Sequence, residues 1–116
     1  MSEKRENFKT GAVRCKLDTV RYDLISPQGL RRLAETYAEG AMKYTEHNWR
    51  KGIPYSNLIN HMLQHINLYL AGDRTEDHLA HAAFGLFAIM EFEETRPELN
   101  DLFNNGETIE TKNSAM

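Results

Sequence analysis

Residues 76–94 read EDHLAHAAFGLFAIMEFEE, and this stretch decides which kind of fold the chain can adopt. From Leu79 to Phe92 it is apolar on nearly every side, which is typical of a helix that is buried all round. Its first turns nevertheless carry two carboxylates and two imidazoles, those of Glu76, Asp77, His78 and His81. Titratable groups at the start of a buried helix make this stretch the first place to look for a functional site.

Two further apolar stripes with helical spacing precede this stretch. Ser26 as N-cap and Pro27 at the first helical position predict a helix that ends near Tyr44. Ser56 as N-cap and Gly72 at the usual C-terminal position predict a second helix.

The third helix is predicted to run from Thr75, its N-cap, to about Arg96, just before Pro97. No strand pattern of useful length occurs, so we expect an all-α domain of three main helices. A three-helix monomer could hardly cover a helix that is apolar all round. The pattern therefore also predicts a homo-oligomer, a dimer or tetramer, in which a neighbouring subunit supplies the missing cover.

A length of 116 residues, 41% of them hydrophobic and 27% charged, fits one globular domain with a real core. We expect residues 1–25 to form a basic N-terminal arm, because they show neither helical nor strand periodicity. Residues 26–97 form the expected helical catalytic domain, and residues 98–116 a polar, flexible tail. A short docking turn in this tail would use Leu99, Leu102 and Phe103.

Composition narrows the classes of function. Residues 1–51 contain 11 Lys or Arg against 7 Asp or Glu, whereas residues 52–116 contain 3 against 10. A basic half suits phosphates and an acidic half suits cations, but the excess is too small for a nucleic-acid-binding protein. No apolar run reaches the roughly 18 residues of a membrane span, and the N-terminus lacks an apolar signal core. Because Cys15 is the only cysteine, no intrachain disulfide is possible, and we expect a cytoplasmic protein.

The titratable groups of the third helix have two interpretations. Asp77 and His81 are four residues apart and His78 lies three before His81, so all three can share one side of the helix. In the simpler interpretation, Glu76 and Asp77 complement the helix dipole and the histidines are hydrogen-bonded core residues. The alternative is that Asp77, His78 and His81 bind a metal ion.

The first helix supplies two more carboxylates, those of Glu35 and Glu39, again four residues apart. Both lie roughly opposite the apolar stripe, as a solvated pair does. They become ligands only if that face looks into a cleft shared with the third helix or with a neighbouring subunit. Carboxylates on one helix, with an acid and imidazoles on another, are how helical bundles build divalent-metal sites.

The segment KYTEHNWRKG, residues 43–52, is predicted to be a loop that mixes aromatic, amide and cationic groups. Its aromatic rings can stack on a planar base, its amide can read hydrogen-bonding edges, and its cations can neutralise phosphates. For Trp49 alone, an anchor in the core is an equally good interpretation. On the second helix, His65 can orient a substrate or a ligand through a hydrogen bond. The candidate substrate-binding residues are Arg14, Lys43, Tyr44, Asn48, Trp49, Lys51 and His65.

The string DLISPQGLRRLAETYAEGAMKYTEHNWRKGIPYS at residues 23–56, followed by GDRTEDHLAHAAFG at residues 72–85, resembles the phage dATP/dGTP diphosphohydrolase family. That family belongs with the all-α, MazG-like nucleoside triphosphate pyrophosphohydrolases. The likeness covers about residues 11 to 95. Its pattern is met at Tyr37-Gly40-Ala41-Lys43-Tyr44, at Asn48-Trp49-Lys51-Gly52, at Gly72-Asp73 and at His78-Leu79-Ala80.

The resemblance implies hydrolysis of dATP or dGTP between the α- and β-phosphates, with Mg²⁺ or Mn²⁺, during phage nucleotide metabolism in the host cytoplasm. In the MazG-like pattern, Glu-Glu-x-x-Glu on one helix and Glu-x-x-Asp on another hold the metal. Glu35 and Glu39 match the outer acids of the first motif, and Thr36 replaces the middle one. The implied catalytic residues are Glu39 and Glu35, and the implied metal ligands are Glu35, Glu39, Asp77, His81 and His78.

Two other functions stay open because the acid set is incomplete. The chain can be a catalytically silent nucleotide-binding module, since Thr36 and the two histidines depart from the pattern. It can also be a structural helical interaction protein. In that case Glu35 and Glu39 form a solvated face and Asp77 complements a helix dipole.

Overall fold

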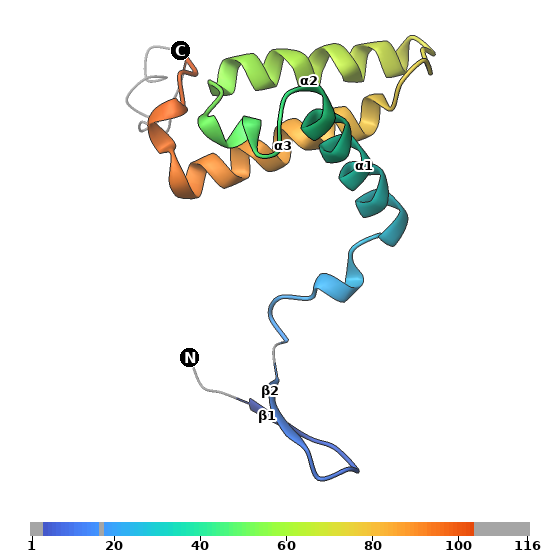
Figure 1. The fold of residues 1–116 in the computed structure, drawn as a ribbon, viewed down its shortest axis with the longest axis vertical. Helices are drawn as coiled ribbons and strands as arrows, with labels where there is room; N and C mark the ends of the chain where they lie inside the picture. The colour runs from blue at the N-terminus through green and yellow to red at the C-terminus, as the bar shows by residue number, and fades with distance from the viewer. Residues whose placement is uncertain (1–3, 17, 104–116) are drawn as a thin grey trace, which may run out of the picture.

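The computed structural model describes residues 4–16 and 18–103 and contains three main helices (Figure 1). These are α1 (Pro27–Lys43), α2 (Tyr55–Leu70) and α3 (His78–Thr95). Single 3₁₀ turns lie at Tyr22–Leu24, Asn48–Lys51 and Pro97–Leu99. The prediction of an all-α fold with three main helices is confirmed.

The N-terminal arm differs from the prediction, because it contains a β-hairpin. Strand β1 (Lys4–Asn7) pairs antiparallel with β2 (Val13–Lys16), and Gly11 in the connection has a φ of +92°. Every residue of both strands is exposed, so neither face shows the apolar–polar alternation by which a strand is recognised. Four-residue strands without that signal were therefore missed. The hairpin projects away from the helices (Figure 1).

The predicted start and end of α1 are confirmed. The Ser26 hydroxyl accepts a hydrogen bond from the Gly29 amide at 3.0 Å, and Pro27 is the first helical residue. The helix ends at Lys43, with Tyr44 as its C-cap.

The predicted start of α2 was wrong, because the helix begins at Tyr55 after Pro54. Pro54 has no side-chain hydrogen-bond acceptor, so it cannot cap the free amides of the first helical turn. A residue far along the chain accepts a hydrogen bond from one of these amides instead. The Asp101 carboxylate accepts hydrogen bonds from the Ser56 amide at 2.9 Å and from its hydroxyl at 2.6 Å. At the other end, Gly72 has a φ of +94° directly after the C-cap Ala71, as predicted.

The predicted N-cap of α3 was also wrong. Asp77, not Thr75, caps the helix, and its carboxylate accepts a hydrogen bond from the Ala80 amide at 3.1 Å. The Thr75 hydroxyl instead donates to the Asp73 carboxylate at 2.9 Å. Threonine and aspartate are both good N-caps. Here the Thr75 hydroxyl is bonded to Asp73, whereas the Asp77 carboxylate bonds the helix amide. The C-terminal end at Arg96 is as predicted.

The core lies between α2 and α3, which run antiparallel and pack Tyr55 and Leu58 against Ala88 and Phe92. Gly85 lies directly against Met62 of α2. A Cβ atom at this position would lie 2.5 Å from Cγ and 2.7 Å from Sδ of Met62, so only glycine fits without a shift. This close contact holds the middle of α3 against the middle of α2.

The C-terminal segment docks on this core. Leu99 and Leu102 pack against the core as the predicted docking turn requires, whereas Phe103 is fully exposed. Most of the predicted flexible tail, residues 104–116, lies outside the described residues.

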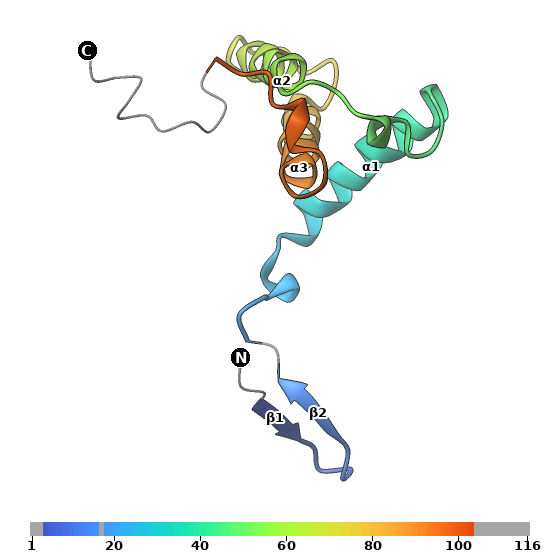
Figure 2. The same ribbon diagram turned by 90° about the vertical axis from the view of Figure 1, so that its left-hand side faces the viewer.

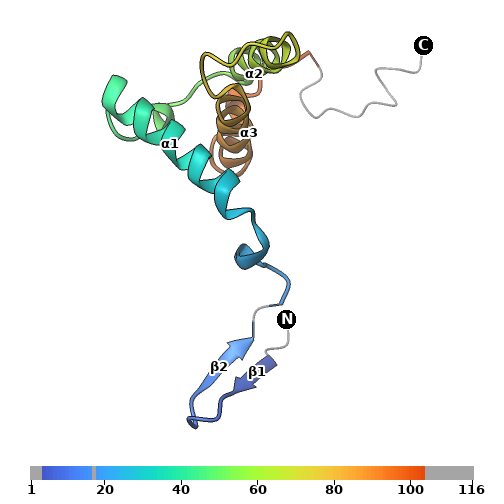
Figure 3. The same cartoon turned by 90° about the vertical axis from the view of Figure 1, so that its right-hand side faces the viewer.

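Helix α1 packs on one side of α3, beside the α2–α3 pair (Figures 2 and 3). No described element covers the opposite side of α3 (Figure 2). Among residues 4–16 and 18–103, no helix is both long and apolar enough to cross a lipid bilayer.

Candidate functional site

Three side chains gather where the C-terminal half of α2 meets the start of α3. His65 comes from α2, Glu76 from the connection and His81 from the first turn of α3. One donor atom from each lies within 4.8 Å of the other two. Nδ1 of His81 is 2.8 Å from Oε1 of Glu76, and Nδ1 of His65 is 3.7 Å from the same oxygen. We call these three residues the donor cluster.

Helix α1 brings a second carboxylate to the cluster. Oε2 of Glu39 lies 3.5 Å from Nε2 of His81, and the Glu39 side chain is 66% exposed. Lys43 follows Glu39 by four residues, so it lies one turn further along the same side of α1. The cluster thus has an exposed carboxylate at its edge on the side of α1, and Lys43 follows that carboxylate one helical turn further on.

Behind the cluster, a hydrogen-bonded chain of three residues runs from Asp73 through the buried His78 to His65. The His78 ring is 2% exposed, and its Nε2 is 2.5 Å from Oδ2 of Asp73. Its Nδ1 is 2.9 Å from Nδ1 of His65. The hydrogen bond from His78 lowers the pKa of Asp73, which therefore stays ionised. Burial, and then the neighbouring His81, lower the pKa of His65, which favours its neutral form as ligation requires.

Asp77 and Glu35, two of the predicted ligands, have arginine partners instead. Arg32 donates to both carboxylate oxygens of Asp77, at 2.8 and 2.6 Å, and holds the pKa of Asp77 down at about 2. Arg31 donates to Glu35 one turn away on α1, at 3.1 and 3.2 Å, and both side chains are exposed. The structure therefore brings Glu39 and His81 together but leaves Glu35 and Asp77 outside the donor cluster.

Trp49 lies inside an aromatic cluster. Its ring packs edge-on against Tyr37 and Phe84 and tilted against Phe92, with ring centroids 5.7 to 6.3 Å apart. The Arg50 guanidinium lies 4.5 Å above the same ring. These contacts agree with the interpretation of Trp49 as an anchor of its loop.

The other candidate substrate-binding residues are spread over the chain. Tyr44 is exposed, and the Lys43 ammonium lies 5.9 Å from its ring centroid. Asn48 is half-buried in the 3₁₀ turn, and Lys51 is exposed while its carbonyl accepts a hydrogen bond from Arg96. Arg14 lies on β2, in the hairpin that projects away from the helices. Within the described residues, only His65 of this group reaches the donor cluster.

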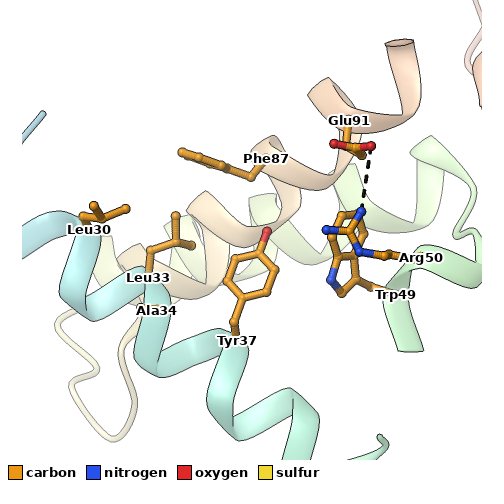
Figure 4. A pocket seen from close by; sticks show the side chains of 8 residues that line it. All are labelled: Leu30, Leu33, Ala34, Tyr37, Trp49, Arg50, Phe87 and Glu91. Carbon is orange, nitrogen blue, oxygen red and sulfur yellow. Dashed lines mark ion pairs between the residues drawn. The ribbon is translucent and has the colours of Figure 1, made fainter. Parts of the chain in front are cut away.

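An apolar groove of about 430 Å³ lies between α1 and α3 (Figure 4). Leu30, Ala34 and Tyr37 line it from α1, and the Arg50–Glu91 ion pair, 3.9 Å long, closes one end. On a helix with 3.6 residues per turn these α1 residues face away from Glu39. The groove and the donor cluster therefore lie on opposite flanks of α1.

The donor cluster fits a divalent ion by its chemistry, because it joins two imidazoles to a carboxylate and places another carboxylate beside them. Mixed nitrogen and oxygen donors suit Mn²⁺ better than Mg²⁺, which prefers oxygen alone. Sequence reasoning missed Glu76 as a donor and Asp73 as a hydrogen-bond partner. It considered Glu76 only as a complement to the helix dipole. The signal that was available is the run of acids and imidazoles between Asp73 and His81.

The arrangement of three main helices is consistent with an all-α, MazG-like fold. A family model described as dATP/dGTP diphosphohydrolase, N-terminal, matches residues 10–102, and the chain belongs to this family. Neither a curated protein nor a solved structure is significantly similar to the chain. The family is one of diphosphohydrolases, and its name identifies dATP and dGTP as the nucleotides concerned.

Proposed function

We propose that the protein is a metal-dependent purine deoxynucleoside triphosphate pyrophosphohydrolase. It would convert dATP or dGTP to the monophosphate and pyrophosphate, with Mn²⁺ or Mg²⁺ as cofactor. Membership of the diphosphohydrolase family supports the reaction class. The observation that carries the metal dependence is the convergence of His65 from α2, His81 from α3 and Glu76 from the connection between them, with Glu39 of α1 beside them.

In this proposal His65, Glu76 and His81 hold the ion, and Glu39 lies beside them on α1. A bound divalent ion would neutralise phosphate charge and lower the pKa of the attacking water. Glu39 is exposed and makes only a long contact with His81, so its carboxylate is available to orient or deprotonate that water. Lys43, one turn further on, can neutralise the departing pyrophosphate.

Three of the metal ligands expected from the sequence remain predictions: Glu35, Asp77 and His78. Before Glu35 or Asp77 could bind the ion, its hydrogen bonds to Arg31 or Arg32, respectively, would have to break. His78 is 2% exposed, and both of its ring nitrogens already have partners. The proposed setting is phage nucleotide metabolism in the host cytoplasm, which rests on the family resemblance.

The test is to incubate the protein with dATP or dGTP and Mn²⁺, and to separate the products by anion exchange. The proposal expects monophosphate and pyrophosphate, whereas diphosphate products would show cleavage at the wrong bond. Glu39→Gln and Glu76→Gln should reduce the rate by at least about 100-fold, in the range of lost acid–base or metal catalysis. Glu94→Gln, an exposed acid near the far end of α3, is the matched control and should retain full activity.

Two alternative functions are outcomes of the same experiment. A silent nucleotide-binding module would show a higher melting temperature with Mn²⁺ and dGTP but release no product. A structural interaction protein would show neither effect, because only ligands of the folded state raise its melting temperature.

We also propose that the protein is a homo-oligomer that uses the uncovered side of the α2–α3 pair. Large apolar side chains with 43–78% exposure form a stripe on each of these antiparallel helices. Both stripes lie on the side of the pair opposite α1. The face consists of Leu63, Ile66, Leu70, Leu79, Leu86 and Met90.

A second copy of the chain is the occupant that this face fits. Each of its six side chains exposes on the order of 100 Å² of apolar surface. Together they supply roughly 600 Å² of the roughly 800 Å² per partner that a standard interface buries. The face carries no charge, so it can pair with itself about a two-fold axis. Light scattering should give a dimer or tetramer for the native chain and a monomer for Leu86→Glu. Met42→Glu, at a 91% exposed position on α1, should leave the assembly unchanged.

A further inference from the structure

The donor cluster is poor in positive charge for a substrate that carries several phosphates. Its own carboxylate and that of Glu39 offset the charge of one bound divalent ion. Arg31 and Arg32 of α1 already bind carboxylates, and Arg74 donates to two backbone carbonyls. Among the cations of α1, this leaves Lys43, one turn beyond Glu39, to neutralise phosphate. A triphosphate in this site therefore needs cations from elsewhere.

The β-hairpin of the arm gathers cations on one of its faces. Lys4, Arg14 and Lys16 share this face, because side chains alternate along a strand. The register places Lys16 directly opposite Lys4 and leaves Glu6 as the one acid of the two strands. Like charges directly opposite each other repel, and Lys4 has only a 3.4 Å ion pair with the exposed Asp18 to relieve this. We call Lys4, Arg14 and Lys16 the cationic face, and its charge suits an anion.

In its own chain the cationic face points away from the donor cluster. The arm joins α1 at Ser26, and Glu39 lies 13 residues further on, about 20 Å along the helix axis. The hairpin continues in the other direction, away from all three helices (Figures 1 and 2). Arg14 and Lys16 therefore do not serve the donor cluster of the chain that carries them.

The segment between the hairpin and α1 carries apolar side chains that the described residues leave exposed. Scattered apolar residues are normal on a protein surface, but several within a short segment mark a surface that binds a partner. Here four large apolar side chains within six residues are 45–76% exposed, namely Val20, Tyr22, Leu24 and Ile25. A second copy of the chain, which the uncovered side of the α2–α3 pair also requires, is the partner at hand.

We propose that the arm of one subunit reaches the donor cluster of a second copy, where Arg14 and Lys16 bind the phosphates of the nucleotide. The inference rests on the proposed function and makes each site a product of two chains. Charge favours this pairing, because residues 4–16 hold five Lys or Arg against one acid, whereas residues 52–116 hold 3 against 10. Residues 14–26 can span up to about 40 Å, which is long enough to cross to a neighbouring subunit.

The position of the arm can be tested without metal or nucleotide. Cys15 is the only cysteine of the chain and is exposed. It lies on the face of β2 opposite Arg14 and Lys16, so a label on it leaves the cationic face free. Native protein with a benzophenone label on Cys15, irradiated at low concentration, should give a covalent dimer in a denaturing gel. Mass spectrometry should locate the label on a peptide that contains Glu39 or His81. Crosslinks within one chain only, or to peptides remote from the donor cluster, overturn the proposal.

Subunit mixing tests what the arm does. One variant carries Arg14→Gln with Lys16→Gln, and the other carries Glu76→Gln. The first should lose roughly 10- to 100-fold in kcat/KM for dGTP, the range for lost hydrogen bonds between charged groups. Coexpressed with different tags and purified as mixed oligomers, the two should recover up to about half of the native activity. The reason is that one site of each mixed pair then combines an intact arm with an intact donor cluster. Mixed oligomers no more active than the separate variants overturn the proposal.

The matched control is Arg5→Gln with Lys9→Gln, which removes two exposed cations of the arm outside the cationic face. This variant should keep its activity within twofold. A loss as large as that of the Arg14→Gln, Lys16→Gln variant would reflect the overall charge of the arm and would overturn the assignment to Arg14 and Lys16.

The arm and the proposed function can fail separately. Native protein that hydrolyses dGTP, together with a fully active Arg14→Gln, Lys16→Gln variant, overturns the role of the arm and leaves the function standing. Native protein that releases no product overturns the function and the phosphate contacts with it, while the Cys15 crosslink still decides where the arm lies.

Discussion

Replacing Gly85 by alanine tests the contact that brings α2 and α3 together. The added Cβ would lie 2.5 Å from Cγ and 2.7 Å from Sδ of Met62, well inside contact distance. Met62 is only 6% exposed, and the clashing atoms are in the middle of its side chain. The side chain therefore cannot simply swing into solvent, and either it or the helix must move.

The expected magnitude is the difference between two effects. Overpacking a core costs about 1–3 kcal/mol, while alanine is better than glycine in a helix by about 1 kcal/mol. Because the contacts of 2.5 and 2.7 Å are far inside van der Waals distance, the overpacking cost lies in the upper part of its range, about 2–3 kcal/mol. Gly85→Ala should thus lower the free energy of unfolding by about 1–2 kcal/mol. For a domain of this size that lowers the melting temperature by roughly 5–10 °C. Because His65 follows Met62 by three residues, a shift of α2 should also weaken Mn²⁺ binding.

The assay is urea unfolding followed by circular dichroism, with Met62→Ala and the double variant completing a cycle. Met62→Ala alone should cost about 2–5 kcal/mol, but in the double variant the new methyl group occupies part of the vacated space. The combined loss should therefore be at least about 1 kcal/mol smaller than the sum of the single losses. A Gly85→Ala protein as stable as the native one, or strictly additive losses, would refute this account of the contact.

The remaining structural predictions concern α3 and the core. Asp77 has its pKa lowered to about 2, so its contribution to stability is complete above the ordinary value of 3.8 and is lost as the pH falls toward 2. The stability of Asp77→Asn should lack this dependence on acid pH, although asparagine still caps the helix. Asp77→Ala should be less stable than Asp77→Asn by about 1 kcal/mol at neutral pH, because alanine cannot cap the helix. Identical acid-unfolding profiles for the native and Asp77→Asn proteins would contradict this prediction. The Tyr55 hydroxyl is buried with no hydrogen-bond partner among the residues described. Tyr55→Phe should thus leave the free energy of unfolding unchanged or raise it by up to about 1 kcal/mol, which a melting curve would detect. A clear decrease in stability would show that the hydroxyl has a hydrogen-bond partner after all.

Much of the helical architecture could be predicted from the sequence, because its signals are local. Ser26 and Pro27 start α1, Gly72 closes α2, and Pro97 follows the end of α3. The start of α3 was misplaced because Thr75 and Asp77 are both good caps, and the choice between them depends on a hydrogen bond to Asp73. The hairpin was missed because its strands are short and exposed on both faces.

The candidate site could be predicted only in part, because it depends on contacts between distant elements. Spacing alone identified His81 and Glu39 as candidates, and the structure brings them within 3.5 Å of each other. Spacing could not show that Arg32, 45 residues before Asp77, would bind that carboxylate. Nor could it show that His65 would meet Glu76, since the turn after Gly72 determines which side chains face each other.

The central claim is that imidazoles from α2 and α3 bind one divalent ion together. The most direct test is pulsed electron paramagnetic resonance of one equivalent of Mn²⁺ bound to the protein, with the histidines labelled with ¹⁵N. The account predicts coupling to directly bound imidazole nitrogen, reduced in His65→Ala and reduced again in the double variant with His81→Ala. A bound Mn²⁺ surrounded only by oxygen, or a signal identical to that of free Mn²⁺ in water, would contradict it.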